Sequence, residues 1–285
     1  LPLQLGYSSS GEVVQTGKGV SDFHTGDRVV SNGNHAEYVV VNQNLCTRIP
    51  DNTDIKEASF TVLGSIALHG LRLSETSLGS KVVVIGLGII GQLVCRLAEA
   101  QGSEVIGIDP DTKRTDMSEN FYTSVEEANM TNVDSVIITA ATSSNEPIEV
   151  ATKIARNKAK IVVVGDIPLN ISRNDFYYKE LELVVSKSYG PGRYDKQYEI
   201  LGKDYPIEYV RWTENRNFEA FIKLLSQNQI HLLDLVTEEV SFENAPSIYK
   251  KFSGEDKPLS IVLRYDNKSE PKIDLQKTVE LEPKT

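Results

Sequence analysis

KVVVIGLGIIGQLVCRLAEAQGSEVIGID, residues 81–109, decides the fold of this chain. Its apolar run from Val82 to Ile85 is typical of a strand that is buried on both faces. Three glycines follow, and apolar residues then recur at helical spacing until Gly102 ends the helix. Residues 104–108 have the pattern of a second strand. The stretch predicts a strand–turn–helix–strand unit of a parallel sheet.

The glycines of this unit have the spacing of a dinucleotide-binding loop. Gly86 makes the tight turn, Gly88 lets the backbone approach a pyrophosphate, and Gly91 lets the helix pack close to the strand. The free N–H groups at the helix start then hold the phosphates. A glycine-rich turn of some other α/β protein is the alternative, but strand, glycines, helix and second strand all arrive in order. The predicted contacts in the loop are Gly86, Leu87, Gly88, Ile89, Ile90 and Gly91.

Asp109 ends the second strand, roughly 20 residues after the glycines, where a carboxylate accepts hydrogen bonds from the adenosine ribose. A carboxylate also repels a 2′-phosphate, so the sequence favours NAD over NADP. Lys113 and Arg114 follow closely and either reach such a phosphate or form a solvated helix start. Ligands of parallel sheets bind beyond the carboxyl ends of the strands. Thr139, Ala140 and Gly165 are therefore further candidate cofactor contacts, the alternative being ordinary strand-end turns.

Composition narrows the class of protein. The chain has 285 residues, a net charge of −10 and 40% hydrophobic residues, which suits a globular protein with a sizeable core. The negative charge argues against nucleic-acid and membrane-surface partners. The two cysteines lie far apart, which indicates reduced thiols in a cytoplasmic protein and no metal site rich in cysteine. No Ser-His-Asp order, HExxH or P-loop lysine supports a hydrolase or a kinase.

The rest of the chain flanks the dinucleotide unit. Residues 5–48 have the pattern of short strands and turns, including a strand at 35–41, and residues 55–70 that of one helix. Strands and helices alternate from 81 to about 188, which predicts a parallel sheet with helices on both faces. The charged stretch from 266 has the composition of a linker or tail.

With these residues in view, the chain resembles the medium-chain dehydrogenase/reductase family. The matching positions are Gly6, Gly11–Val14, Gly26–Val29, Ala36–Tyr38 and the unit at 81–109. The resemblance implies an α/β fold in which a Rossmann doubly wound parallel sheet is inserted in a partial GroES-like β domain. It divides the chain into a GroES-like part at 1–63, a Rossmann domain at 64–205, a return to the GroES-like domain at 206–265 and a linker or tail at 266–285.

More narrowly, residues 5–8, 44–46 and 189–195 look like bacterial two-module oxidoreductases linked to surface-polysaccharide synthesis. In those proteins a zinc-free module precedes a Gfo/Idh/MocA-type sugar dehydrogenase module. On this interpretation the chain is a fragment, lacking the first GroES-like strands and a C-terminal module.

The resemblance also implies where zinc ligands would stand. A Gly-His-Glu motif in the zinc enzymes corresponds here to Gly6-Tyr7-Ser8, so Tyr7 replaces a ligand histidine. A later ligand cysteine falls near Leu63, and the first ligand would precede Leu1. A catalytic zinc needs three protein ligands, so we expect no zinc. Carbonyl chemistry would then depend on hydrogen bonding or a proton donor.

Single residues are candidates for that chemistry. Tyr7 is either a proton donor or an aromatic side chain that fills the vacated zinc position. His35 either binds substrate or is structural, and His69 at a helix end is structural. Arg193 follows Gly190-Pro191-Gly192 and either meets an anionic group of the cofactor or belongs to a plain turn.

The function expected from these features is zinc-independent, NAD(P)(H)-dependent oxidoreduction of an alcohol or carbonyl, with a sugar or nucleotide-sugar implied by the resemblance. A non-catalytic dinucleotide-binding module and a quinone or enone reductase stay open as alternatives. Family members often pair through the edge strand of the sheet. The resemblance therefore implies a homodimer, with residues 181–186 as the edge strand that pairs.

Overall fold

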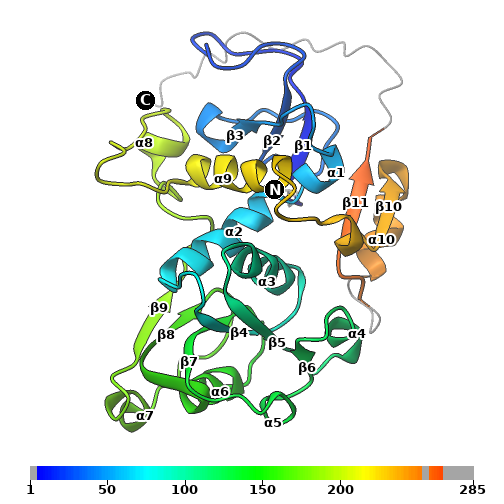
Figure 1. The fold of residues 1–285 in the computed structure, drawn as a ribbon. Helices are drawn as coiled ribbons and strands as arrows, with labels where there is room; N and C mark the ends of the chain where they lie inside the picture. The colour runs from blue at the N-terminus through cyan, green and yellow to red at the C-terminus, as the bar shows by residue number, and fades with distance from the viewer. Residues whose placement is uncertain (1–4, 252–256, 266–285) are drawn as a thin grey trace, which may run out of the picture.

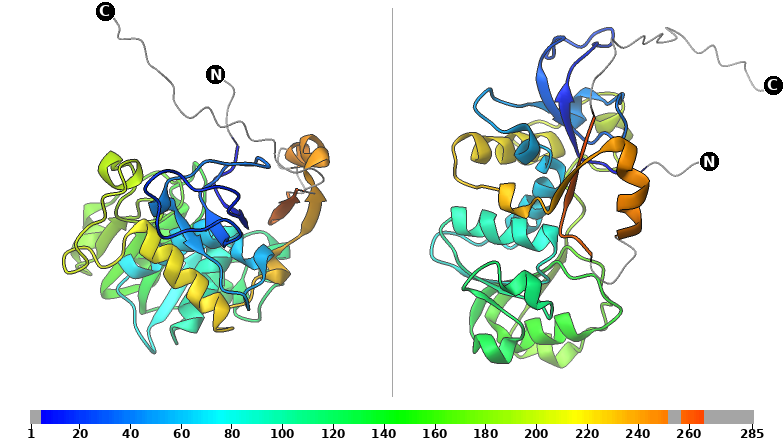
Figure 2. Two further views of the ribbon diagram at one scale, coloured as in Figure 1. Left: turned by 90° about the horizontal axis from the view of Figure 1, so that it is seen from above. Right: turned by 90° about the vertical axis from the view of Figure 1, so that its right-hand side faces the viewer.

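A six-stranded parallel sheet occupies one end of the molecule, and a three-stranded antiparallel sheet the other (Figures 1 and 2). Helices α2 (Thr61–Leu73) and α9 (Glu214–Ser226) lie between them. This computed structural model describes residues 5–251 and 257–265. Within those ranges no helix has both the length and the apolar character needed to cross a bilayer. The predicted α/β class with a parallel sheet is confirmed.

The large sheet has the strand order β6-β5-β4-β7-β8-β9, with every neighbouring pair parallel. Its strands are β4 (Lys81–Ile85), β5 (Glu104–Ile108), β6 (Phe121–Tyr122), β7 (Val133–Ile138), β8 (Ala155–Val163) and β9 (Glu182–Val185). The small sheet has the order β1-β2-β3, formed by β1 (Ser9–Glu12), β2 (Arg28–Ser31) and β3 (Cys46–Arg48). Strands β10 (Glu238–Ser241) and β11 (Ile261–Arg264) form a separate parallel pair.

Some of the remaining helices flank the large sheet, and others pack near the small sheet or beside the β10–β11 pair. They are α1 (Ile55–Ala58), α3 (Ile89–Ala100), α4 (Thr112–Thr115), α5 (Val125–Ala128), α6 (Glu146–Ile154), α7 (Arg173–Tyr177), α8 (Lys196–Glu199) and α10 (Ala245–Lys251), with 3-10 turns at Gln43–Leu45, Leu233–Leu235 and Phe242–Asn244. Successive residues of β4 face opposite cores, since Val82 and Val84 pack with α2, α3 and α9, whereas Val83 and Ile85 pack with α6. The alternation explains why this strand is apolar throughout.

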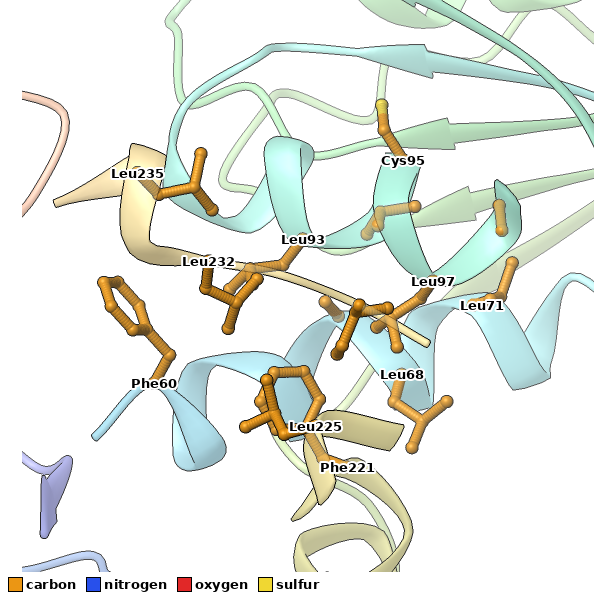
Figure 3. Close-up of a cluster of buried hydrophobic side chains, with 14 of the residues drawn as sticks. Phe60, Leu68, Leu71, Leu93, Cys95, Leu97, Phe221, Leu225, Leu232 and Leu235 are labelled. Carbon is orange, nitrogen blue, oxygen red and sulfur yellow. The ribbon is translucent and has the colours of Figure 1, made fainter. Parts of the chain in front are cut away.

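Helix α2 aligns the two ends of the molecule because it packs on α3 and α9 at once (Figure 3). All four of the following residues belong to one buried cluster between α2 and α3. Phe60 and Leu93 lie near the starts of these two helices, and Leu71 and Leu97 lie further along them. The helix α9 approaches so closely that a Cβ on Gly64 would lie 2.1 Å from the ring of Phe221. The small sheet is therefore held at a fixed position relative to the glycine loop.

Two local predictions are wrong. Residues 35–38 bend instead of forming a strand. Both sides of β2 are already paired, by β1 and β3, and His35 instead donates its N–H to the Leu5 carbonyl oxygen at 2.7 Å. The predicted helix at 55–70 is two helices, because the hydroxyl of Thr61 donates to the Ala58 carbonyl oxygen (2.7 Å) at the junction. The predicted tail at 266–285 lies outside the described residues.

Candidate functional site

The glycine loop between β4 and α3 has the geometry that its spacing predicts. Gly86 has φ +97° and packs so tightly that a Cβ would lie 2.6 Å from the Ala140 nitrogen. A Cβ on Gly91 would lie 1.9 Å from the Gly86 carbonyl oxygen, so helix and strand are in close contact. By contrast, a Cβ on Gly88 would meet nothing within 4 Å. The open space at Gly88 is where a pyrophosphate can approach the backbone.

Helix α3 begins directly after this open space. Gly88 is its N-cap and has no side chain that could satisfy the first N–H groups, which are therefore free to hold an anion. Ile89 and Ile90 are partly buried and pack on the core beneath. Leu87 is fully buried and its N–H points to Asp109. The loop thus offers main-chain donors above an apolar base.

Asp109 is buried at the end of β5 and is held by three donors. One oxygen accepts from the Leu87 N–H (2.6 Å) and from Nη1 of Arg114 (3.0 Å), and the other accepts from the Asp111 N–H (2.9 Å). Arg114 also pairs with Asp111 at 3.3 Å. Lys113 lies at the start of α4, and its N–H donates to Asp111 (3.1 Å). The structure therefore brings the predicted ribose carboxylate and both predicted cations to one place.

Thr139, Ala140 and Gly165 meet the glycine loop at the carboxyl edge of the sheet. The Thr139 hydroxyl donates to the Gly86 carbonyl oxygen at 2.5 Å, and the Ala140 N–H donates to Ile85 at 3.1 Å. A Cβ on Gly165 would lie 2.0 Å from the Ala140 carbonyl oxygen. Small side chains are thus required where β4, β7 and β8 end together.

Arg193 has a different set of contacts. Its Nη1 donates to Glu199 at 2.7 Å, and its guanidinium lies over the rings of Tyr189 and Tyr194, 5.0 and 4.1 Å from their centroids. None of these contacts is with the glycine loop. The structure holds Arg193 in the loop that follows β9, within a polar cluster of its own.

Tyr7 and His35, the candidate acid–base residues, lie on two segments that contact each other, since the His35 N–H donates to the Leu5 carbonyl oxygen at 2.7 Å. Tyr7 is 52% exposed, and the next residue, Ser8, donates its hydroxyl to the Ser59 carbonyl oxygen at 2.5 Å. The His35 ring covers Gly6, where a Cβ would lie 2.1 Å from the ring. Burial lowers the pKa of His35, so its imidazole is neutral at pH 7. Since Ser59 precedes Phe60 of the α2–α3 cluster, the segment with Tyr7 is anchored where α2 begins.

Tyr249 on α10 is a residue that sequence reasoning missed. Its hydroxyl forms a hydrogen bond with Nδ1 of His35, and the two rings stack with centroids 6.0 Å apart. Burial raises the pKa of Tyr249, so it keeps its proton at neutral pH. No local pattern links the two residues, because they are 214 positions apart.

The side chains at the implied zinc positions do not fit a zinc ion. Leu63 is partly buried against the core, and Tyr7 offers a phenol in place of an imidazole. Within residues 5–251 and 257–265, no three His, Cys, Asp or Glu side chains cluster as metal ligands do. Both cysteines are buried, and burial raises the pKa of Cys46 to about 12, so it stays a thiol.

A hollow elsewhere on the surface contains none of the predicted site residues. It has a volume of about 500 Å³ and lies between segments of the small sheet and α9. Its lining residues include Phe23, Asn44, Arg48, Asn215 and Lys223. The candidate site is therefore defined by the glycine loop and the carboxyl edge of the sheet.

Two family models match the chain in succession. One describes the alcohol dehydrogenase GroES-like domain and matches residues 1–51. The other describes the NAD-binding domain of D-isomer specific 2-hydroxyacid dehydrogenases and matches residues 64–175. The glycine loop and Asp109 lie within the second match.

Whole proteins of similar sequence and structure are dehydrogenases by name. D-guloside 3-dehydrogenase of Escherichia coli (strain K12) is 26% identical over 272 residues, covering 87% of this chain and 73% of that protein. Galactitol-1-phosphate dehydrogenase from Escherichia coli has a TM-score of 0.75 at 21% identity, covering 92% of this chain and 84% of that one. 2R,3R-butanediol dehydrogenase from Bacillus subtilis has a TM-score of 0.73 at 20% identity, covering 92% and 81%. A GroES-like segment followed by a dinucleotide-binding sheet, together with these relatives, supports the resemblance of the chain to the medium-chain dehydrogenase/reductase family.

Proposed function

We propose that the chain is an NAD(P)(H)-dependent oxidoreductase that transfers a hydride between nicotinamide C4 and a carbon of a polyol or sugar. The observation that carries the proposal is the open backbone at Gly88, set between the Asp109 carboxylate and the small residues at 139–140 and 165. The names of the relatives, a guloside dehydrogenase among them, support the substrate class. The resemblance of the sequence extends it to a nucleotide-sugar in surface-polysaccharide synthesis.

NAD(H) is the proposed cofactor. Asp109 is buried and already holds the Arg114 guanidinium at 3.0 Å, which leaves that cation less able to bind a 2′-phosphate. The carboxylate itself can accept from the ribose hydroxyls and repels a phosphate at the same position. Lys113 is the residue that NADP would have to recruit.

Zinc independence is also part of the proposal, and it rests on the side chains at the implied ligand positions. With Tyr7 and Leu63 there, the substrate oxygen has to exchange its proton with a side chain. The exposed Tyr7 hydroxyl is the proposed proton donor, and the neutral His35 imidazole, hydrogen-bonded to Tyr249, is the proposed proton acceptor beside it. When it is bound, the dinucleotide would accept the hydride from an alcohol or supply it to a carbonyl.

The arrangement of the full protein is proposed as well. We keep the division into 1–63, 64–205 and 206–265, to which the separate sheets β1–β3, β4–β9 and β10–β11 give support. The linker at 266–285 and a following sugar-dehydrogenase module lie outside the described residues. The free thiols suit the reducing cytoplasm.

A homodimer through β9 is the proposed assembly. This strand is at the edge of the large sheet, as predicted, and Val185 is 59% exposed. An open edge strand is able to pair with a second copy. Val185→Lys should shift the mass measured by light scattering from dimer to monomer, whereas Val185→Thr should not.

The test of the function begins with cofactor binding. NADH and NADPH are titrated by fluorescence into the wild type and Asp109→Ala, and we expect saturable NADH binding whose preference over NADPH is lost in the variant. Asp134→Ala is the matched control, because Asp134 also accepts from a main-chain N–H (Lys81, 2.8 Å) and from an arginine (Arg156, 2.6 Å), but at the amino end of its strand. Failure of both cofactors to bind would refute the proposed function.

Turnover then separates the remaining alternatives. A D-guloside and galactitol 1-phosphate are offered with NAD⁺, and formation of NADH is followed by absorbance. Tight NADH binding without turnover of any alcohol or carbonyl would favour the non-catalytic dinucleotide-binding module. Reduction of a quinone with a clear preference for NADPH would favour the enone-reductase alternative.

A further inference from the structure

The loop that follows β9 lies at the same edge of the sheet as the cofactor residues. All six strands are parallel, so their carboxyl ends share one edge, and β9 lies next to β8, which ends at Val163, two residues before Gly165. A cofactor that runs from Asp109 past Gly88 to β7 and β8 places its reacting end beside this loop. The segment 186–194 is therefore on the substrate side of the proposed site.

The loop is fixed to the two helices that separate the sheets. Asn217 of α9 donates to the Tyr189 carbonyl oxygen at 3.0 Å, and a Cβ on Gly190 would lie 3.2 Å from Nδ1 of His69 on α2. Gly190 and Gly192 have φ of +108° and +107°, a backbone that other residues rarely adopt. The sequence Gly-Pro-Gly thus sets one defined loop shape.

Glu214 lies under this loop, and its carboxyl group faces that of Glu199. It is the first residue of α9, it is 0% exposed, and neither carboxyl oxygen accepts a hydrogen bond from the described residues. Its N–H donates to the Pro191 carbonyl oxygen at 2.9 Å, and a Cβ on Gly192 would lie 2.9 Å from its Oε1. A buried carboxyl group without a partner costs stability, and packing alone would be served better by an apolar side chain.

The surroundings decide the protonation state of this carboxyl group. Arg193 pairs with Glu199 (2.7 Å) and not with Glu214. The titratable and charged groups that face Glu214 are Lys187, Tyr189, Arg193, Tyr198, Glu199 and Tyr205. Burial, and then the charge of Glu199, raise the pKa of Glu214 to about 8. At pH 7 Glu214 is therefore a carboxylic acid that lies beside the Arg193–Glu199 ion pair.

We propose that Glu214 is a positioning residue: buried beneath the Gly190–Arg193 loop, it keeps the Glu199–Arg193 pair in place and so fixes the substrate-facing side of the loop. That side includes Tyr194, which is 67% exposed and lies under the Lys187 and Arg193 cations, 5.3 and 4.1 Å from its ring centroid. When Glu214 ionises, a second carboxylate competes with Glu199 for the same guanidinium, and the loop loosens. This inference rests on the proposed function.

The first measurement needs no substrate. Because the pKa of Glu214 is raised in the folded state, its stabilising contribution is full below pH 4.5 and is lost as the pH rises through about 8. The unfolding equilibrium of the wild type should therefore shift by up to roughly tenfold per pH unit over this window. Glu214→Gln should remove that slope. Glu146→Gln is the matched control, since Glu146 is the first residue of α6 but is exposed.

The second measurement tests positioning. With galactitol 1-phosphate or a D-guloside and saturating NAD⁺, the wild-type KM should rise above pH 8, by up to roughly tenfold per pH unit, with kcat little changed. Glu214→Gln, which keeps shape and hydrogen-bonding capacity, should hold KM constant over the same range. Glu214→Leu should have a raised KM at all pH values.

Each outcome tests one part of the proposal. If unfolding depends on pH equally in the wild type and Glu214→Gln, Glu214 is not a neutral acid in the folded protein. If Glu214→Leu and Glu214→Gln have equal KM values, the role of the residue is packing alone. If unfolding depends on pH as expected but KM does not change with pH, Glu214 does not position the loop for substrate. Absence of turnover with every probe, despite the slope, would refute the proposed function and the substrate-facing half of the inference together.

Discussion

Substitution of alanine for two glycines of the same loop should affect different properties: Gly91→Ala mainly stability, and Gly88→Ala mainly cofactor binding. In Gly91→Ala the new Cβ would lie 1.9 Å from the Gly86 carbonyl oxygen and 2.8 Å from the Thr139 hydroxyl. The first obstacle is backbone, so α3 has to move away from β4, and overpacking of this kind costs about 1–3 kcal/mol. Helix propensity returns up to about 1 kcal/mol for Gly→Ala. We expect a net loss of about 1–2 kcal/mol in the free energy of unfolding.

Gly88→Ala meets no obstacle in the protein. The backbone of Gly88, with φ −64° and ψ −177°, is open to any residue, and its Cβ has no neighbour within 4 Å. Loss of a good N-cap should cost about 0.5–1 kcal/mol. The methyl group occupies the space of the pyrophosphate, so NADH should bind at least about tenfold more weakly, which is about 1.4 kcal/mol.

Urea unfolding and fluorescence titration of NADH, applied to both variants, separate the two effects. Gly88→Ala should lose only the small N-cap contribution to stability and lose NADH binding, whereas Gly91→Ala should have the larger loss of stability. Wild-type affinity in Gly88→Ala would show that the pyrophosphate does not lie over this residue, and the assignment of the loop would be wrong. Unchanged stability in Gly91→Ala would contradict the close contact between helix and strand.

The remaining predictions concern the packing around α2 and the buried thiol. Burial and the charge of Arg72 lower the pKa of His69 to about 4, so up to about 3 kcal/mol of unfolding free energy is lost as the pH falls from 6.5 through 4. In urea unfolding, His69→Gln should reduce this dependence of the unfolding free energy on pH. The same pH dependence in the variant and the wild type would contradict the prediction. Gly64→Ala drives a methyl group into Phe221 and should lower the unfolding free energy by about 1–3 kcal/mol, measured by the same method. With its raised pKa, Cys46 should not react with a thiol reagent at pH 8 until the protein unfolds, and rapid labelling of the native protein would refute this.

The cofactor half of the site was predictable because its signals are local. Gly86, Gly88 and Gly91 are contiguous with the strand and helix that they join, and each meets the space that its spacing implies. Asp109 terminates a strand whose end is visible in the sequence. Here the local sequence pattern agrees with the tertiary structure, because the residues that contact one another lie within a single short window of sequence.

The other half depends on contacts that no window contains. His35 meets Tyr249 from 214 positions away, and the alternation at 35–41 indicated a strand only because nothing in the sequence shows that β2 is already paired on both sides. Helix α9 begins at Glu214, before the apolar periodicity starts at Phe218. Thr213, which accepts from the Arg216 N–H, was the available N-cap signal.

Arg193 shows what a local sequence pattern leaves open. Its rigid Gly-Pro-Gly context suggested an anion-binding arginine for the cofactor, and in the structure its guanidinium pairs with Glu199 at the end of α8. Strand order bears on its proposed role, since β9 lies beyond β8 and thus past the strands proposed to receive the dinucleotide. In the proposed function, a loop at that position faces the substrate. The same reasoning makes Glu214, which no sequence pattern marked, the residue whose protonation should register in KM and not in cofactor affinity.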